Sequence, residues 1–120
     1  MNNVISEHKK MVAAIVKEGI EIVASIDPDK AHLWHMATGV AGESGELIDA
    51  VKKHVIYNKP LDVDNLIEEL GDLEFYMEGI RGCIGVSREE ILEVNYHKLS
   101  KRYNGLKYSD EAAIRRADKE

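Results

Sequence analysis

The chain has 120 residues, 44% of them hydrophobic, and a formal net charge of −6. These values fit one domain with a modest core and argue against a general binder of the nucleic-acid backbone, which needs a basic surface. The single cysteine, Cys83, excludes an intramolecular disulfide and a zinc site built from several cysteines.

No segment has the pattern of a membrane anchor or a secretion signal. The longest unbroken apolar run, Met11 to Val16, is far too short to cross a bilayer. The first eight residues also lack the apolar centre of a signal peptide. We therefore expect a cytoplasmic protein that binds neither membrane nor nucleic acid.

The first predicted helix runs from about Val4 to Ser25. Its apolar residues recur at three- and four-residue steps, which is typical of an amphipathic helix packed against a core. Pro28 disfavours helical geometry at Asp27 and suits the first turn of a following helix. We therefore expect a second helix to begin at Pro28 or Asp29.

The second helix is predicted to continue to Ile56 and carries Gly39, Gly42 and Gly45 at three-residue intervals. Each glycine in a helix interior costs about 0.5–1 kcal/mol relative to alanine. One explanation is that a partner helix or a ligand comes close to this backbone. The other is tight helix packing alone, and the two are compatible.

The third helix is predicted to start after Asp62 or Asp64 and to end near Arg81, because an aspartate suits a helix start. Residues 82–86 interrupt the pattern.

The fourth helix is predicted over residues 88–101, behind a capping box made by Ser87 and Glu90. Ser109 is a candidate cap for a last short helix through Arg116.

No stretch alternates as a strand would, so the predicted fold is all-α. We expect an antiparallel helical bundle of four main helices plus a short C-terminal helix, with a domain over residues 1–103 and a tail over 104–120. The apolar and glycine-lined faces exceed what four helices of one chain can hide. A homodimer or homotetramer is therefore expected.

Two pairs of acids border the apolar stripes of the second and third helices: Glu43 with Glu46, and Glu69 with Asp72. Residues three apart share one face of a helix. The turn of residues 57–62 lets the third helix fold back along the second, so the four carboxylates are expected to converge. Chance placement of 22 acids already gives about four such pairs, and the chain has five, so spacing alone proves little.

Converging carboxylates need a counter-charge. Two of them about 5 Å apart repel by roughly 3 kcal/mol at an effective dielectric of about 20. Four oxygen donors without sulfur or imidazole are the ligand chemistry of Mg²⁺, with Mn²⁺ as a substitute. The sequence contains no Glu-x-x-His, which counts against a ferritin-like di-iron bundle.

Charge is unevenly distributed along the chain. Leu61 to Gly79 carries seven acids and no base, whereas Lys98 to Lys107 carries four bases and no acid. This separation suits a ligand that arrives as a metal with a polyphosphate. It equally suits two solvated faces of opposite sign.

Three motifs in order make the sequence recognisable. Gly42 to Leu47 reads GESGEL, Glu68 to Leu73 reads EELGDL, and Asn95 to Tyr103 reads NYHKLSKRY. The stretch from about His35 to Tyr103 resembles the MazG-like all-α nucleoside triphosphate pyrophosphohydrolases. Glu74 departs from the apolar residues usual in that family after the second motif, so it either faces solvent or is an extra acid near the site.

The resemblance implies hydrolysis of a nucleoside triphosphate between its α- and β-phosphates, giving the monophosphate and pyrophosphate. Glu46 is our candidate for the general base. Carried over by position, the Mg²⁺ ligands are Glu43, Glu46, Glu69 and Asp72, and the phosphate- or nucleotide-binding residues are Asn95, Lys98 and Arg102.

Lys98 and Arg102 are also explained by the dipole of a helix C-terminus alone. For base recognition we select His35, two turns before Glu43, and Tyr76, although an aromatic residue on an apolar helix face is more often part of the core.

Two other classes of function stay open on the sequence. A nucleotide-sensing or partner-binding module would keep the metal site without turnover. A structural helical adaptor would bind no Mg²⁺.

Overall fold

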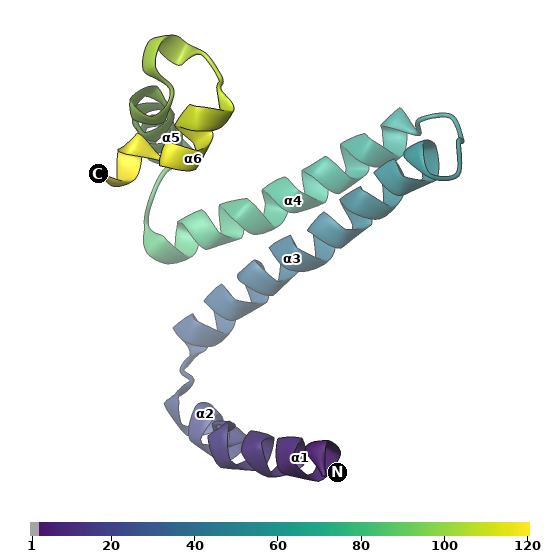
Figure 1. Ribbon diagram of the computed structural model, residues 1–120, viewed down its shortest axis with the longest axis vertical. Coiled ribbons are helices and arrows are strands. Elements are labelled where there is room, and N and C mark those ends of the chain that lie inside the picture. The colour runs from purple at the N-terminus through teal and green to yellow at the C-terminus, as the bar shows by residue number, and fades with distance from the viewer. Residues whose placement is uncertain (1–2) are drawn as a thin grey trace. The chain divides into compact units, whose positions relative to one another are not determined.

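The structure is a computed structural model that describes residues 3–120 (Figure 1). Every regular element in this part of the chain is a helix, which confirms the all-α prediction. The backbone divides into two compact units, one ending at His32 and one covering Leu33–Glu120. The elements are α1 (Val4–Ile15), α2 (Gly19–Ser25), α3 (Pro28–Val55), α4 (Val63–Ile84), α5 (Arg88–Arg102), the 3-10 turn η1 (Asn104–Leu106), α6 (Asp110–Arg115) and the 3-10 turn η2 (Ala117–Lys119).

Two helices, α1 and α2, lie within residues 4–25, so the prediction of one helix from Val4 to Ser25 is wrong. The backbone is extended at Val16, with φ −61° and ψ 135°, and at Glu18, with φ −66° and ψ 140°. Gly19 follows directly, and glycine favours helix less than almost any other residue, so a break here costs little.

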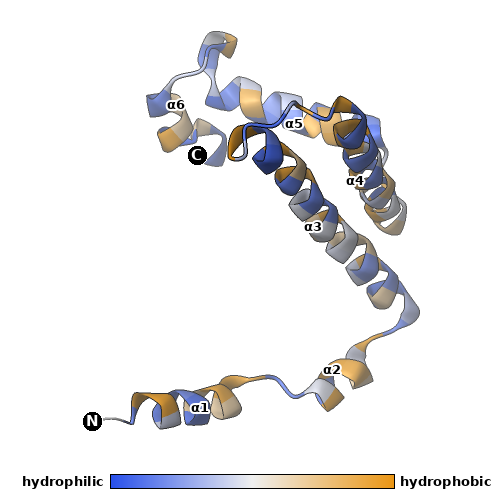
Figure 2. Ribbon diagram, turned by 90° about the vertical axis from the view of Figure 1, so that its right-hand side faces the viewer, coloured by the Kyte–Doolittle hydropathy of each residue, from blue (hydrophilic) through white to orange (hydrophobic). Residues whose placement is uncertain are grey.

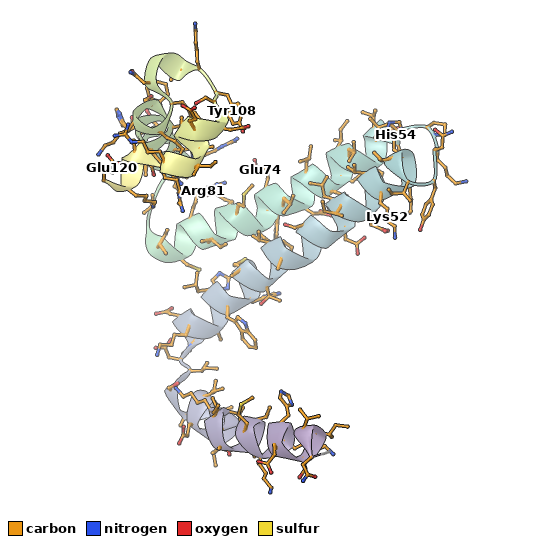
Figure 3. The ribbon with its side chains drawn as sticks, in the orientation of Figure 1. Lys52, His54, Glu74, Arg81, Tyr108 and Glu120 are labelled. Atoms are coloured by element: carbon orange, nitrogen blue, oxygen red, sulfur yellow. The ribbon has the colours of Figure 1, made fainter. Side chains whose placement is uncertain are left out.

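In the second unit, α3 and α4 form an antiparallel hairpin (Figure 1). Local bonds fix both ends of the turn. The Lys59 N–H donates to the Lys53 carbonyl over 3.2 Å, and the His54 Nδ1 lies 2.7 Å from the Lys59 carbonyl oxygen (Figure 3). The Asp62 carboxylate accepts from the Asn65 N–H at 3.0 Å and caps α4. The bonds to the Lys53 carbonyl and from the Asn65 N–H satisfy terminal backbone groups of α3 and α4 that have no partner within their own helix.

Two glycines let side chains of one helix pack onto the backbone of the other. A Cβ built on Gly39 of α3 would overlap the ring of Tyr76 from α4. A Cβ built on Gly79 of α4 would overlap the sulfur of Met36, which is 6% exposed. These reciprocal contacts hold the helices at a fixed distance and register.

The other two glycines of α3 have a different environment. Apart from its chain neighbours and the nearby backbone of α3 itself, an added Cβ at Gly42 or Gly45 would meet no atom within 4 Å in the described part of the chain. Of the three, only Gly39 therefore serves packing between α3 and α4.

The joint between α4 and α5 follows the sequence signals. α4 ends at Ile84, three residues beyond the predicted end near Arg81, and Gly85 caps it in the left-handed conformation with φ 68°. The Ser87 hydroxyl accepts from the Glu90 N–H at 3.1 Å, and the Glu90 carboxylate accepts from the Ser87 N–H at 3.3 Å. The predicted capping box is confirmed.

Glu74 pairs with two arginines at this joint. Its two carboxylate oxygens lie 3.6 Å from Arg81 and 3.5 Å from Arg88. Arg81 is only 8% exposed, and its Nε also donates to Glu78 over 2.7 Å (Figure 3). Glu74 and Glu78 thus provide the counter-charges of a buried guanidinium.

The residues after α5 fold back onto it, so that α5 packs against α6, η1 and η2. The Ser109 hydroxyl accepts from the Ala112 N–H at 3.0 Å and caps α6, as predicted. The Arg102 guanidinium donates to both oxygens of Asp118, over 2.6 and 3.1 Å. This ion pair fastens η2 to the end of α5.

Hydrophobic and hydrophilic residues interleave along α3 and α4 (Figure 2). Among the described residues the buried apolar side chains are Met36 and Ala50. None of the described helices has an apolar stretch long enough to cross a bilayer. The four-helix bundle and its completion by further copies stay predictions.

Candidate functional site

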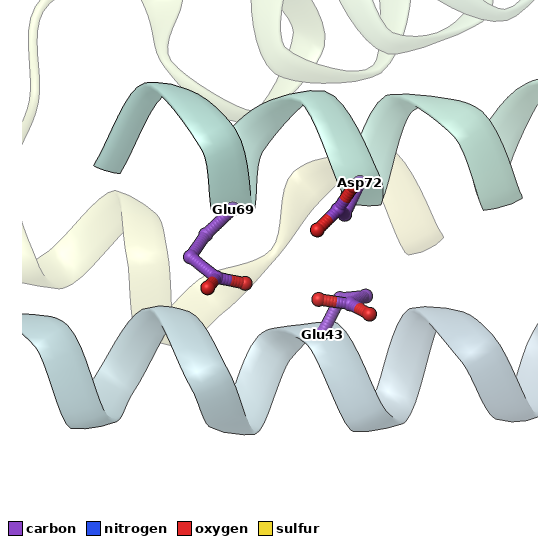
Figure 4. Close-up of side chains that lie close together, drawn as sticks. All are labelled: Glu43, Glu69 and Asp72. Atoms are coloured by element: carbon purple, nitrogen blue, oxygen red, sulfur yellow. The ribbon is translucent and has the colours of Figure 1, made fainter. Parts of the chain in front are cut away.

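Three of the four predicted metal ligands meet between α3 and α4. Glu43 projects from α3, and Glu69 and Asp72 project from α4, one turn apart (Figure 4). One carboxylate oxygen from each lies within 4.8 Å of the other two. We call these three residues the acidic cluster. It forms because the hairpin turns one acidic face toward the other.

Glu69 is the most perturbed member of the acidic cluster. Its side chain is half-buried, and its Oε2 atom is fully buried with no hydrogen-bond partner in the described part of the chain. The pKa of Glu69 is raised above its ordinary value of 4.5, first by burial and then by the Glu43 carboxyl, which can share a proton with it. The negative charges of Glu43, Glu46 and Asp72 raise this pKa further.

The cluster fits a hard divalent cation. Each of its donors is a carboxylate oxygen, which suits Mg²⁺ or Mn²⁺ better than a soft metal. Two carboxylates about 5 Å apart repel by roughly 3 kcal/mol at an effective dielectric of about 20. A cation would relieve this repulsion and give the buried Glu69 oxygen a partner.

Glu46 lies at the edge of this arrangement. It follows Glu43 by one turn on α3 and is exposed, and it is not one of the three residues whose oxygens meet. Its charge still acts on Glu69. The chain therefore offers three close oxygens and a fourth carboxylate beside them.

His35 and Tyr76, the residues selected for base recognition, face each other across the hairpin. Their ring centroids are 6.3 Å apart in an edge-on arrangement. Tyr76 also lies edge-on to Phe75, with 5.1 Å between centroids, and occupies the space above Gly39. Tyr76 is thus firmly packed, while His35 is exposed.

Asn95, Lys98 and Arg102 lie on α5, away from these contacts. Asn95 and Lys98 are exposed. Arg102 is half-buried and held by Asp118, whose negative charge and hydrogen bonds raise the pKa of the arginine. Within residues 3–120, none of the hydrogen bonds or ion pairs joins these three side chains to the acidic cluster.

Sequence reasoning missed the partner of Arg102. Asp118 is 16 residues further along the chain and no motif marks it. The chain reaches this position through reversals at Gly105, with φ 71°, and at Arg116, with φ 53°. The glycine at 105 was the available signal, because it stops α5 and allows a tight turn.

The family model of the MazG nucleotide pyrophosphohydrolase domain matches residues 32–106, a stretch that includes the acidic cluster and α5. Neither the curated proteins nor the solved structures gave a match.

Proposed function

The chain belongs to the MazG nucleotide pyrophosphohydrolase domain family, and from this premise we propose that it is a Mg²⁺-dependent nucleoside triphosphate pyrophosphohydrolase. The reaction is hydrolysis of the bond between the α- and β-phosphates of a ribo- or deoxyribonucleoside triphosphate. Its products are the nucleoside monophosphate and pyrophosphate. The convergence of Glu43, Glu69 and Asp72 from two helices is the observation that supports it best.

The acidic cluster and Glu46 would hold the cation. A Mg²⁺ ion held there would neutralise phosphate oxygens and would lower the pKa of a coordinated water. The half-burial of Glu69 keeps its charge poorly solvated, so the carboxylate gains more from a cation than an exposed acid would.

Glu46 is the best candidate for the general base. It stands beside the acidic cluster on the same helix as Glu43, and it is exposed, so water reaches it. A carboxylate that is not fully engaged by a cation can take the proton of the attacking water. The proton then resides on a Glu46 carboxylate oxygen.

Lys98 and Arg102 would bind the polyphosphate, since four residues separate them on one face of α5 and the arginine can grip two oxygens. Asn95 would contact the nucleotide from one turn earlier on the same helix. His35 would stack on the base, and Tyr76 would hold His35 in position.

We also propose that the protein acts as a homodimer or homotetramer. On α4, the apolar side chains of Ile67, Leu70 and Phe75 are 61%, 51% and 67% exposed. Exposed apolar side chains in such number favour burial against another subunit. A second copy is also a route by which an α5 could approach an acidic cluster.

Product identification tests the proposed reaction. The protein is incubated with Mg²⁺ and each common ribo- and deoxyribonucleoside triphosphate, and the phosphate products are separated. Monophosphate and pyrophosphate are expected, with loss of both in Glu69→Gln and Glu46→Gln. Orthophosphate as the first product contradicts the proposal, and Mg²⁺-dependent binding without turnover indicates a nucleotide-sensing module instead.

A further inference from the structure

A basic pocket that contains Arg102 and none of the acidic-cluster residues lies where the chain folds back on the end of α5. Its volume is about 460 Å³, which is within the usual size range for small ligands. Four of its nine lining residues are basic and one is acidic. The lining consists of Lys101, Arg102, Asn104, Lys107, Ser109, Glu111, Ala112, Arg115 and Ala117. We call it the C-terminal pocket.

Carboxylates of the chain already pair with both arginines of the C-terminal pocket. Asp118 is 4% exposed and Arg102 is 15% exposed, and the two form a bidentate pair over 2.6 and 3.1 Å. Arg115 makes a similar pair with Glu120 over 3.1 and 3.2 Å, but on the surface. Lys101 donates to the main-chain oxygen of Glu120 over 3.2 Å.

One cation of the pocket has no such partner. Within residues 3–120, Lys107 makes no ion pair. The pocket therefore combines a rigid guanidinium, which recognises two oxygens at once, with an ammonium that is open to a further charge. A phosphoryl group offers three oxygens and up to two negative charges, and so fits this combination better than the single carboxylate of Asp118.

We propose that the C-terminal pocket binds a diphosphate group, either free pyrophosphate or the terminal phosphates of a nucleotide, and that Asp118 is its built-in competitor. The ligand displaces Asp118 from Arg102 and gains Lys107. This proposal rests on the proposed function only in taking Arg102 as a phosphate ligand. It adds that the segment from Ala117 to Glu120 must leave the arginine before a phosphate can reach it.

Binding of pyrophosphate in the absence of metal tests the proposal by calorimetry. Excess EDTA keeps the acidic cluster unoccupied, so that it repels the anion. Asp118→Asn is expected to bind pyrophosphate about tenfold more tightly than the unaltered chain, because a charge-assisted pair no longer competes. Glu93→Gln, which makes the same charge change at an exposed position on α5, is expected to stay within about twofold.

A second pair of variants tests the proposal independently, in case Asp118→Asn disrupts the packing of the C-terminal segment on α5. Lys107→Ala is expected to weaken pyrophosphate binding about fivefold or more, and Lys119→Ala, outside the pocket lining, by less than twofold. Equal losses in the two lysine variants would indicate diffuse charge attraction and overturn the proposal. An affinity of Asp118→Asn equal to that of Glu93→Gln would overturn it too.

The two sources of a diphosphate group are separated by repeating the titration with a nucleoside triphosphate. An equal gain for both ligands in Asp118→Asn supports recognition of the diphosphate alone, and a larger gain for the nucleotide supports the terminal phosphates of a substrate. No turnover takes place in EDTA, so these titrations test pyrophosphate binding independently of hydrolysis. A protein that fails to hydrolyse nucleotides can still show the proposed binding, and an active enzyme can still lack it.

Discussion

Tyr76 of α4 occupies the space that a side chain on Gly39 of α3 would fill. The overlap involves the ring atom attached to the Tyr76 Cβ as well as atoms further out, so a small rotation of the ring does not remove it. Tyr76 lies one turn beyond Asp72, and Gly39 lies one turn before Glu43. The contact therefore sets the separation of the two helices next to the acidic cluster.

Gly39→Ala is expected to destabilise the protein. Inserting a methyl group into a packed contact typically costs about 1–3 kcal/mol, and here it pushes α3 away from α4. The control is Gly42→Ala, one turn along α3, where an added Cβ would meet no described atom within 4 Å beyond its chain neighbours and the nearby backbone of α3. Alanine should stabilise the helix there by about 0.5–1 kcal/mol. Urea denaturation measures both, and an equal cost at the two positions contradicts this role for Tyr76.

Glu69→Gln is expected to stabilise the metal-free protein at about pH 7. The pKa of Glu69 is raised in the folded state, so the folded chain holds this proton more tightly than the unfolded chain does. Stability from this group is therefore fully present below the unfolded value of 4.5 and is lost as the pH rises through the folded pKa. The advantage of glutamine should shrink as the pH falls toward 4.5.

Thermal melting in EDTA across this pH range measures the effect. The matched control is Glu68→Gln, which changes the same chemical group at the preceding, exposed position. It should show no such pH-dependent advantage. Parallel behaviour of the two variants would attribute the effect to net charge alone.

Mg²⁺ is expected to raise the melting temperature of the unaltered protein. A site filled at 100 times its dissociation constant adds about 2.7 kcal/mol to the free energy of unfolding. Glu43→Gln should lose most of this gain, because it removes the one member of the acidic cluster that α3 supplies. Asp49→Asn, an exposed acid later on α3, should keep it. A melting temperature indifferent to millimolar Mg²⁺ points to the structural adaptor.

Glu74→Gln is expected to lower stability by about 1–2 kcal/mol without affecting Mg²⁺ binding. The change weakens the contacts to Arg81 and Arg88 and leaves the buried Arg81 with Glu78 as its remaining ion-pair partner among the described residues. Chemical denaturation with and without Mg²⁺ separates the two effects. Loss of the Mg²⁺ response would mean instead that Glu74 belongs to the metal site.

Local signals predicted most helix boundaries correctly. Asp62, Ser87 and Ser109 each cap the helix that the sequence assigned to them, because capping depends only on a side chain and the backbone three residues away. The break between α1 and α2 was missed, since apolar periodicity continues through Val16 and hides it. The spacing of the acids could say which faces carry carboxylates, but not that Glu43 would come nearer to Glu69 and Asp72 than Glu46 does.

Contacts between residues that are far apart in the sequence could not be predicted from such local signals. The residue opposite Gly39 depends on the register of two helices, and the partner of Arg102 depends on two chain reversals. Neither is encoded within a window of a few residues. Both depend on the three-dimensional path of the backbone.

The reciprocal contacts of Met36 with Gly79 and of Tyr76 with Gly39 also determine which insertions and deletions the chain can tolerate. These contacts, and not the turn after His54, fix how the two helices face one another. Residues could therefore be gained or lost in that turn with little effect on the fold. One residue added between Asp62 and Glu69 is different, because it rotates everything beyond it by about 100° relative to the helix start. Among homologues of this protein, the length of the turn should vary, whereas the number of residues from Asp62 to Asp72 should stay constant.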